Sequence, residues 1–189
     1  MSSTAELVRE HQVIERVLTS LDGRLRAARE AGTLDAAWLR TVVTFSRQFI
    51  DRCHHGKEEG CLFPCLERRG IPREGGPIGV MLREHQMGRE LVRRITEALD
   101  GYARGTAPLE EVLVPGQAYV DLLRQHIVKE NTILFLMADA VLETADDDAN
   151  LRCFGEREEE IGHTAPARLV RLAEEITEAF PAADRMERP

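Results

Sequence analysis

Apolar residues recur every three or four positions along most of the chain, which is the spacing of amphipathic helices. Such stripes, separated by short stretches rich in Gly and Pro, predict four long helices: residues 4–30, 35–69, 77–103 and 108–143. Within the last helix, Pro115 and Gly116 are expected to kink or restart the chain. No segment alternates apolar and polar residues over a useful length, so the pattern predicts an all-α fold.

Four long amphipathic helices with short connections predict an antiparallel up-down-up-down four-helix bundle over residues 1–145. Residues 146–180 predict a fifth helical region, interrupted near Gly155 and Gly162. Residues 146–189 are therefore expected to form a C-terminal helical appendage packed on the bundle. No internal repeat is evident in the sequence.

Composition narrows the class of protein. The chain has 189 residues, 43% of them hydrophobic, and a formal net charge of −8. A negative protein repels phosphate and anionic lipid, so neither nucleic acid nor membrane is the expected partner. The longest apolar stretch, residues 133–142, is too short to span a bilayer, and the N-terminus lacks the apolar core of a signal peptide. We therefore expect a cytoplasmic protein.

The sequence contains four cysteines, at positions 53, 61, 65 and 153. In a reducing compartment they are expected to be free thiols rather than a disulfide framework. Cys61 and Cys65 are one helical turn apart, so helix packing is the first interpretation and zinc ligation is the weaker alternative.

Each of the four main stripes carries a histidine where a leucine would be expected: His11, His54, His85 and His126. Glutamates follow the second and the fourth histidine by four residues, at Glu58 and Glu130. Residues four apart share a helix face, so all six side chains are expected to point into one bundle. The stripe of the last helix is accordingly expected to continue through Ile133, Met137 and Val141.

Burying these polar groups without partners would cost several kcal/mol each, and a bound metal removes that cost. Imidazoles and carboxylates together suit iron, manganese or zinc, and their number is too large for one tetrahedral zinc. Two iron ions bridged by the two carboxylates would use the whole set. Taken singly, each histidine is more simply a hydrogen-bonded core residue, so the metal hypothesis rests on the joint pattern.

Four further residues have open roles. His55 and Glu59 form a second HxxxE pair, rotated by about 100° around the helix from the first pair. Three interpretations of this second pair are open: it is exposed, it lies just outside the metal ligands, or His55 is an additional ligand. Tyr119, two turns before His126, is an ordinary core residue or a phenol that hydrogen-bonds a bridging carboxylate or a bound oxygen species. His163 follows Glu160 as the single ExxH pair, so a ferritin-like site is disfavoured and His163 is expected at the surface.

The order of these motifs resembles that of the hemerythrin-like, or HHE cation-binding, proteins of bacteria. The resemblance covers about residues 5–143 and is carried by four segments: REHQVIERVL (9–18), CHHGKEEGCLFP (53–64), GPIGVMLREHQMGRE (76–90) and LLRQHIVKENTILF (122–135). It implies a non-haem di-iron site in a four-helix bundle, with the irons bridged by two carboxylates and an oxo or hydroxo oxygen. Carried over by residue, the four stripe histidines would be terminal ligands, and Glu58 and Glu130 the bridges.

Two departures from the oxygen-carrying hemerythrins matter. Those proteins have an HxxxH pair on the third helix, where this chain has Met81 and Arg89 on either side of His85. They also have an Asp five residues after the last histidine, where this chain has Glu130 at four. The nearest replacement for the missing ligand is His55; without it, one iron keeps an open position.

An open position favours reaction with O2, peroxide or NO over reversible oxygen carriage. The expected function is thus a di-iron protein that binds or reacts with a small oxidant, in sensing, scavenging or iron homeostasis. If the protein is an enzyme, it would be a di-iron oxidoreductase acting on peroxide or NO. The alternatives are a metal-binding or iron-storage protein without redox turnover, and a metal-free helical interaction module.

Overall fold

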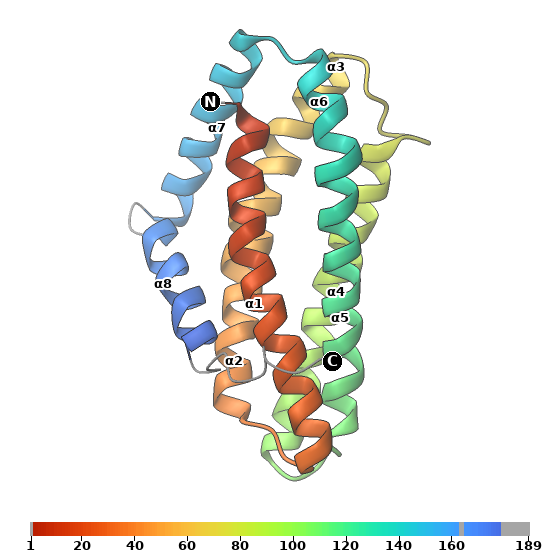
Figure 1. The fold of residues 1–189 in the computed structure, drawn as a ribbon, viewed down its shortest axis with the longest axis vertical. Helices are drawn as coiled ribbons and strands as arrows, with labels where there is room; N and C mark the ends of the chain where they lie inside the picture. Colours follow the sequence, from red (N-terminus) through yellow and green to blue (C-terminus); the bar gives the residue numbers. More distant parts are fainter. Residues whose placement is uncertain (1, 163–164, 179–189) are drawn as a thin grey trace, which may run out of the picture.

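The computed structural model describes residues 2–162 and 165–178, in which all regular secondary structure is helical (Figure 1). The all-α prediction is therefore confirmed. In chain order the helices are α1 (Ser3–Ala31), α2 (Ala36–Phe45), η1 (Ser46–His55), η2 (Glu58–Leu62), α3 (Phe63–Arg68), α4 (Pro77–Ala103), α5 (Glu110–Lys129), η3 (Glu130–Leu134), α6 (Phe135–Val141), α7 (Thr144–Ile161) and α8 (Ala165–Glu178).

The predicted long helices correspond to long rods that lie side by side along the molecule (Figure 1). The second rod is α2 continued by η1, η2 and α3, and the fourth is α5 continued by η3 and α6. The η segments are π-helices, with wide turns that bond five residues back, and such turns are frequent at functional sites. The chain runs down α1, up the second rod, down α4 and up the fourth rod (Figure 1).

The last long helix is not interrupted at Pro115 and Gly116, so the predicted restart does not occur: α5 begins at Glu110 and runs through both residues. Gly116 packs close to Leu25 of α1, and a Cβ there would lie 3.0 Å from Leu25 Cδ1. The glycine therefore marks a close helix approach rather than a break.

Two apolar clusters stack along the rods, and the polar stripe residues lie between them. In α1, Leu7 belongs to one cluster and Ile14 to the other, with His11 between them. In the fourth rod, Ile127 and Leu134 stand in the same relation to Glu130. The candidate site is thus a buried polar layer with apolar packing on both sides.

The C-terminal segment packs along α1 and the second rod (Figure 1). The predicted interruption at Gly155 is wrong, because α7 is continuous there, whereas the break at Gly162 is present, with φ of 116°. Leu169 and Ile176 of α8 join the main core, and Trp38 Nε1 donates a hydrogen bond of 3.3 Å to the Ile176 carbonyl. The sequence expectations for His163 and residues 179–189 lie outside the described residues.

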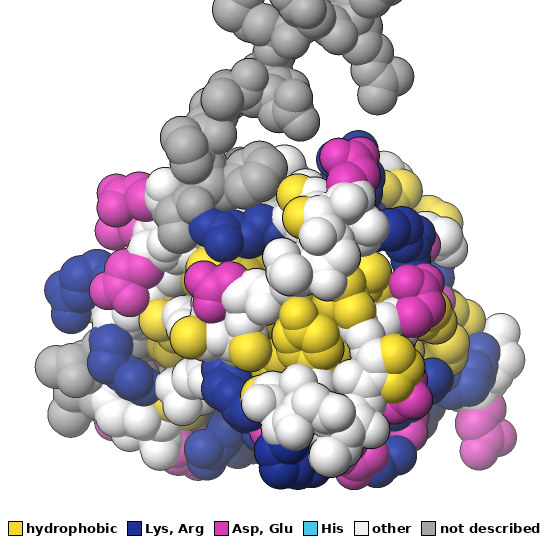
Figure 2. Space-filling view, turned by 90° about the horizontal axis from the view of Figure 1, so that it is seen from below, with side chains coloured by type: hydrophobic (Ala, Val, Ile, Leu, Met, Phe, Trp, Pro, Cys, Tyr) yellow, Lys and Arg dark blue, Asp and Glu magenta, His cyan; other side chains and the backbone are white. Residues whose placement is uncertain are grey.

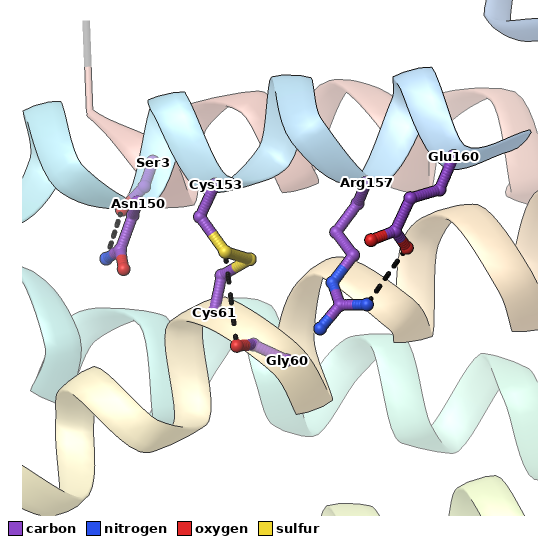
Figure 3. Close-up of a disulfide and its surroundings, with 7 residues drawn as sticks. All are labelled: Ser3, Gly60, Cys61, Asn150, Cys153, Arg157 and Glu160. Carbon is purple, nitrogen blue, oxygen red and sulfur yellow. Dashed lines mark hydrogen bonds and ion pairs between the residues drawn. A yellow bond between two sulfur atoms is a disulfide. The ribbon is translucent and has the colours of Figure 1, made fainter. Parts of the chain in front are cut away.

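The expectation that all four cysteines are free thiols is wrong, because Cys61 of η2 and Cys153 of α7 form a disulfide (Figure 3). The two residues are 92 positions apart, so only the docking of α7 on η2 brings them together. The disulfide also excludes Cys61 as a zinc ligand in this state. Cys53 and Cys65 are free and buried.

Charged and apolar side chains share the surface at the lower end of the molecule, and no described histidine is visible there (Figure 2). None of the helices that the structure describes is long and apolar enough to cross a membrane.

Candidate metal centre

Four histidines point their Nε2 atoms into the polar layer from four different rods. The Nε2 atoms of His11 and His54 lie 3.0 Å apart, and those of His85 and His126 lie 3.2 Å apart. All four side chains are buried. The layer therefore holds two close pairs of imidazoles.

Two glutamates connect these histidine pairs. Glu58 has Oε1 at 3.7 Å from His54 Nε2 and Oε2 at 3.4 Å from His85 Nε2. Glu130 has Oε2 at 3.2 Å from both His11 Nε2 and His126 Nε2. Each carboxylate thus spans from one pair to the other, which is the placement of a bridging ligand.

The carboxylates of Glu58 and Glu130 are 0% exposed, and their four oxygens have no hydrogen-bond partner among the described residues. Burial and the neighbouring Glu130 raise the pKa of Glu58 well above its usual value. Burial also disfavours ionised Glu130, but His126 and His11 outweigh it and lower the pKa of Glu130. Buried acid oxygens without donors are costly, and a cation would satisfy them.

The outward nitrogens of the histidines support the same conclusion. His54 Nδ1 lies 2.8 Å from Glu10 Oε2, and His11 Nδ1 lies 2.8 Å from Asn131 Oδ1. Both partners are acceptors, so a neutral imidazole donates from Nδ1 and presents an unprotonated Nε2 inward. Two lone pairs that face each other at 3.0 Å favour a cation between them.

Lysines complete two of these outer contacts. Glu10 accepts from Lys57 at 2.6 Å, and Glu84 accepts from Lys129 while its other oxygen lies 3.0 Å from His126 Nδ1. Burial opposes ionisation of Glu10, but His54 and Lys57 outweigh it and lower its pKa. The outer carboxylates therefore remain charged and hold the imidazoles in orientation.

Glu59 takes the same part for His85, with Oε1 at 2.7 Å from His85 Nδ1. Arg89 donates to Glu59 and to Asp51, at 2.7 Å in each case. Arg89 lies four residues after His85, one of the two positions where the resemblance would place a second histidine, and here it supports an outer carboxylate. Glu59 thus contacts the outward nitrogen of His85 and lies outside the layer of inward-facing Nε2 atoms.

His55 is buried, so the alternative that it is exposed is wrong: the residue is 3% exposed and its ring stacks on His85, with centroids 3.8 Å apart. The reason is the π-helix η1, in which residues five apart share a face, as Ile50 and His55 do. A spacing of four residues per turn would place the His55 side chain away from the buried stripe. The wider turn of the π-helix places it on the buried face instead.

Two groups of potential ligand atoms result, in each of which all atoms lie within 4.8 Å of one another. One group consists of His55, Glu58, His85 and His126, and the other of His11, His54, Glu58 and Glu130. They share Glu58 and differ in imidazole content, three against two. Nitrogen and oxygen donors in this mixture suit iron, manganese or zinc.

The site contains an approximate repeat that sequence inspection missed. Both the first and the third rod carry REHQ, at residues 9–12 and 83–86, and both the second and the fourth carry HxxKE, at residues 54–58 and 126–130. In each half, the glutamate of REHQ contacts the histidine and the lysine of HxxKE. The signal that could have revealed the outer residues was this duplicated tetrapeptide.

The repeat extends to the backbone, because η2 begins at Glu58 and η3 begins at Glu130. After Glu130 the π turn shifts the buried stripe by one residue. Leu134 and Ala138 are buried, whereas Ile133 is 52% exposed and Met137 is 38% exposed. The predicted continuation of the stripe through Ile133 and Met137 is therefore wrong.

Tyr119 is buried and lies beside Ser46, on the wall of a cavity that also reaches His55. Burial raises the pKa of the Tyr119 phenol, so the phenol is neutral at physiological pH.

Comparison with known proteins agrees with this geometry. A family model described as "Hemerythrin HHE cation binding domain" matches residues 2–138. Curated relatives include uncharacterised proteins of Mycobacterium bovis and of two Mycobacterium tuberculosis strains, each 28% identical over 166 residues. These matches cover 82% of this chain and 64% of each relative, so the chain spans less than two thirds of their length.

No solved structure matches the chain. The family model, by contrast, covers well over half of it, and it does so over the rods that carry every residue of the polar layer. This chain belongs to the hemerythrin HHE cation-binding domain family.

Proposed function

We propose that the protein is a non-haem di-iron protein that binds or reacts with a small oxidant: O2, peroxide or NO. The observation that carries the proposal is the pair of ligand groups that share Glu58, each containing imidazole and carboxylate atoms within 4.8 Å of one another. The proposed ligands are His11, His54, His55, Glu58, His85, His126 and Glu130. Two irons held by these residues would supply electrons and Lewis-acid positions to a small oxidant.

The protein's own contribution begins with charge. Glu58 and Glu130 would offset part of the positive charge of two metal ions, and their buried position keeps them from competing donors. The three outer acids, Glu10, Glu59 and Glu84, fix the tautomer of their histidines and raise their basicity as ligands. Lys57, Lys129 and Arg89 neutralise those acids in turn.

The two proposed metal positions differ in their imidazole content. The group around His85 and His126 gains a third imidazole from His55, whereas the group around His11 and His54 has two. Each group offers four protein ligands, so the two positions differ in the kind of donor and not in the number of donors. Apolar packing on both sides of the layer excludes water from it.

The architecture proposed to hold this centre is an up-down-up-down four-helix bundle formed by residues 1–145, with residues 146–189 as a C-terminal appendage. A net charge of −8 supports a small-molecule ligand rather than nucleic acid. Cytoplasmic localisation remains part of the proposal, although structural disulfides are rare in a reducing compartment.

Elemental analysis and an absorption spectrum of protein from iron-supplied cells test the proposal. We expect roughly two irons per chain and near-ultraviolet bands that change when azide is added. Bound metal whose spectrum ignores azide, O2 and peroxide would instead support a storage protein. Absence of metal, with a melting temperature that chelator leaves unchanged, would support a metal-free interaction module.

A further inference from the structure

The approximate repeat continues beyond the candidate metal centre, along the second and the fourth rod. Residues 54–63 read HHGKEEGCLF and residues 126–135 read HIVKENTILF, with five of ten positions identical. The helices keep the same register: η2 and η3 end at Leu62 and Leu134, and α3 and α6 begin at Phe63 and Phe135. Each position in this part of the second rod therefore has a counterpart 72 residues later in the fourth rod.

Helix α7 covers one face of this part of the second rod (Figure 1). Cys153 of α7 is bonded to Cys61 (Figure 3), and Glu158 of α7 accepts a hydrogen bond from Lys57 at 2.5 Å. Phe154, on the same side of α7, is buried in the apolar cluster that contains Cys61. The positions of the second rod that contact α7 are Lys57, Gly60, Cys61 and Cys65.

The counterpart positions in the fourth rod lie on an exposed and largely apolar face. Together with the neighbouring Leu136 we call them the fourth-rod face: Lys129, Thr132, Ile133, Leu136 and Met137. Among the described residues six large hydrophobic side chains are exposed, and four of them lie within residues 128–137. Exposed apolar side chains that gather in this way mark interaction surfaces in soluble proteins.

Charge on the fourth-rod face favours an acidic occupant. In each half of the repeat the lysine donates to one outer acid, and Lys57 donates in addition to Glu158 of α7. The side chain of Lys57 is 1% exposed, whereas that of Lys129 is 33% exposed. The ammonium of Lys129 is therefore open to a second carboxylate, which is the contact that α7 supplies in the other half.

We propose that the fourth-rod face binds an acidic amphipathic helix of a partner protein, as the second rod binds α7. The apolar side of that helix packs on Ile133, Leu136 and Met137, and one of its carboxylates pairs with Lys129. The template has the same character, because α7 contains seven acidic and two basic residues. The α7 of a second copy is bonded to its own second rod and does not supply this helix. The inference concerns a surface and does not depend on bound metal.

Size differences between the two halves define a probe. Arg157 of α7 packs against Gly60, where an added Cβ would lie 2.8 Å from Arg157 Nη2, and the counterpart of Gly60 is the larger Thr132. Cys153 would likewise meet Ile133 in place of a cysteine. A helix on the fourth-rod face therefore needs small side chains at both places. The probe is a fluorescent peptide of residues 144–161 with Cys153→Ala and Arg157→Ala, which are also favourable changes in a helix.

Fluorescence anisotropy of this peptide, titrated with the full-length protein, measures binding. We expect saturable binding to the unmodified protein and a dissociation constant at least about tenfold higher for Ile133→Glu, because a charge replaces the central apolar contact. Val114→Glu is the matched control, since Val114 near the start of α5 is 52% exposed, as Ile133 is. It should bind as the unmodified protein does.

Two changes in the peptide test the charge contact. Glu158→Gln should weaken binding roughly threefold to tenfold, because it removes the carboxylate that faces Lys129. Glu156→Gln is the control, since Glu156 is exposed in α7, and it should leave binding unchanged. Absence of saturable binding, equal loss in both peptides, or binding that survives Ile133→Glu would overturn the proposal. So would a dimer in analytical ultracentrifugation that Ile133→Glu dissociates, which would assign the fourth-rod face to a second copy.

Discussion

Glu58 and Glu130 are the two acids inside the polar layer, and of these two it is Glu58 whose pKa is raised by folding. Both are fully buried, they belong to the same ligand group, and their oxygens lack donors among the described residues. An acid whose pKa is raised by folding destabilises the folded state at pH values above its unfolded pKa. The metal-free protein therefore carries a cost that the metal-bound protein does not.

Replacing Glu58 by Gln should accordingly act in opposite directions on the two forms. We expect Glu58→Gln to stabilise the metal-free protein by about 1–3 kcal/mol at neutral pH, because it removes a buried acid without donors. The gain should shrink toward pH 4, where the acid is protonated in the folded and unfolded states alike. Urea unfolding at the two pH values measures it. Bound metal should fall, and a variant that keeps full metal would refute Glu58 as a ligand.

The outer acids give a second prediction at the scale of residues. Glu10→Gln and Glu84→Gln, which occupy matching places in the repeat, should each weaken metal binding about 10–100-fold, since each orients one histidine. Competition with a chromogenic chelator measures the affinity. Glu90→Gln is the control, because Glu90 is exposed on α4 and paired with Arg93. A loss in Glu90→Gln equal to that in Glu84→Gln would show that the effect is not local.

Sequence reasoning was strongest for residues that violate a hydrophobic pattern. His11, His85 and Glu130 stand where leucine is expected, and the structure brings all three into one layer. Glu10 and Glu84 violate nothing, because a glutamate next to a stripe looks like an ordinary solvent-facing residue. Their role depends on contacts between rods, which spacing within one helix does not contain.

Among the helical elements, the π turns decide which residues face the centre. The stripe up to Glu130 follows i, i+3 and i+4 spacing, and beyond it η3 moves Leu134 to the position that Ile133 would have occupied. The wide turns of η1 similarly turn His55 inward. Helical periodicity therefore predicted the rods and their site residues but not the register after each wide turn.

The disulfide is the second feature of the elements that sequence could not supply. It joins α7 to η2, the segment that begins with Glu58, and Figure 3 shows Arg157 of α7 lying close to Gly60 in the same region. Lys57 also pairs with Glu158 of α7 at 2.5 Å. Helix α7 is thus attached to the segment that carries Glu58.

Breaking this bond should destabilise the protein by about 2–4 kcal/mol, because an intact bridge restricts the unfolded chain. Denaturant unfolding with and without a dithiol reductant measures the loss. A Cys61→Ala, Cys153→Ala double variant is the control, and in it the reductant should have no further effect. Equal sensitivity in the variant, or an intact mass that shows four free thiols in the unreduced protein, would contradict the assignment.

Over the whole molecule, the C-terminal segment shares the core of the rods. Leu169, Ala173 and Ile176 are buried in the same cluster as Leu21 and Leu39. Composition and periodicity predicted a helix packed on the bundle, but the shared core and the hydrogen bond from Trp38 to Ile176 could only come from the folded arrangement.

A substitution at Ile176 tests that shared core. Ile176→Ala should cost about 2–5 kcal/mol, as for other buried isoleucines, in a single unfolding transition that includes the rods. Calorimetry measures both the size and the number of transitions, and the exposed Glu175→Ala is the matched control. A separate low-temperature transition that leaves the main one unchanged would show that α8 folds independently.

The proposed chemistry depends above all on two metal ions held by the two ligand groups. Anomalous X-ray diffraction at the iron absorption edge, on crystals of protein purified from iron-supplied cells, locates such ions without reference to activity. We expect two anomalous peaks, one beside His11 and His54 and one beside His55, His85 and His126, with Glu58 between them. A single peak, or density away from these side chains, would contradict a dinuclear centre at this layer.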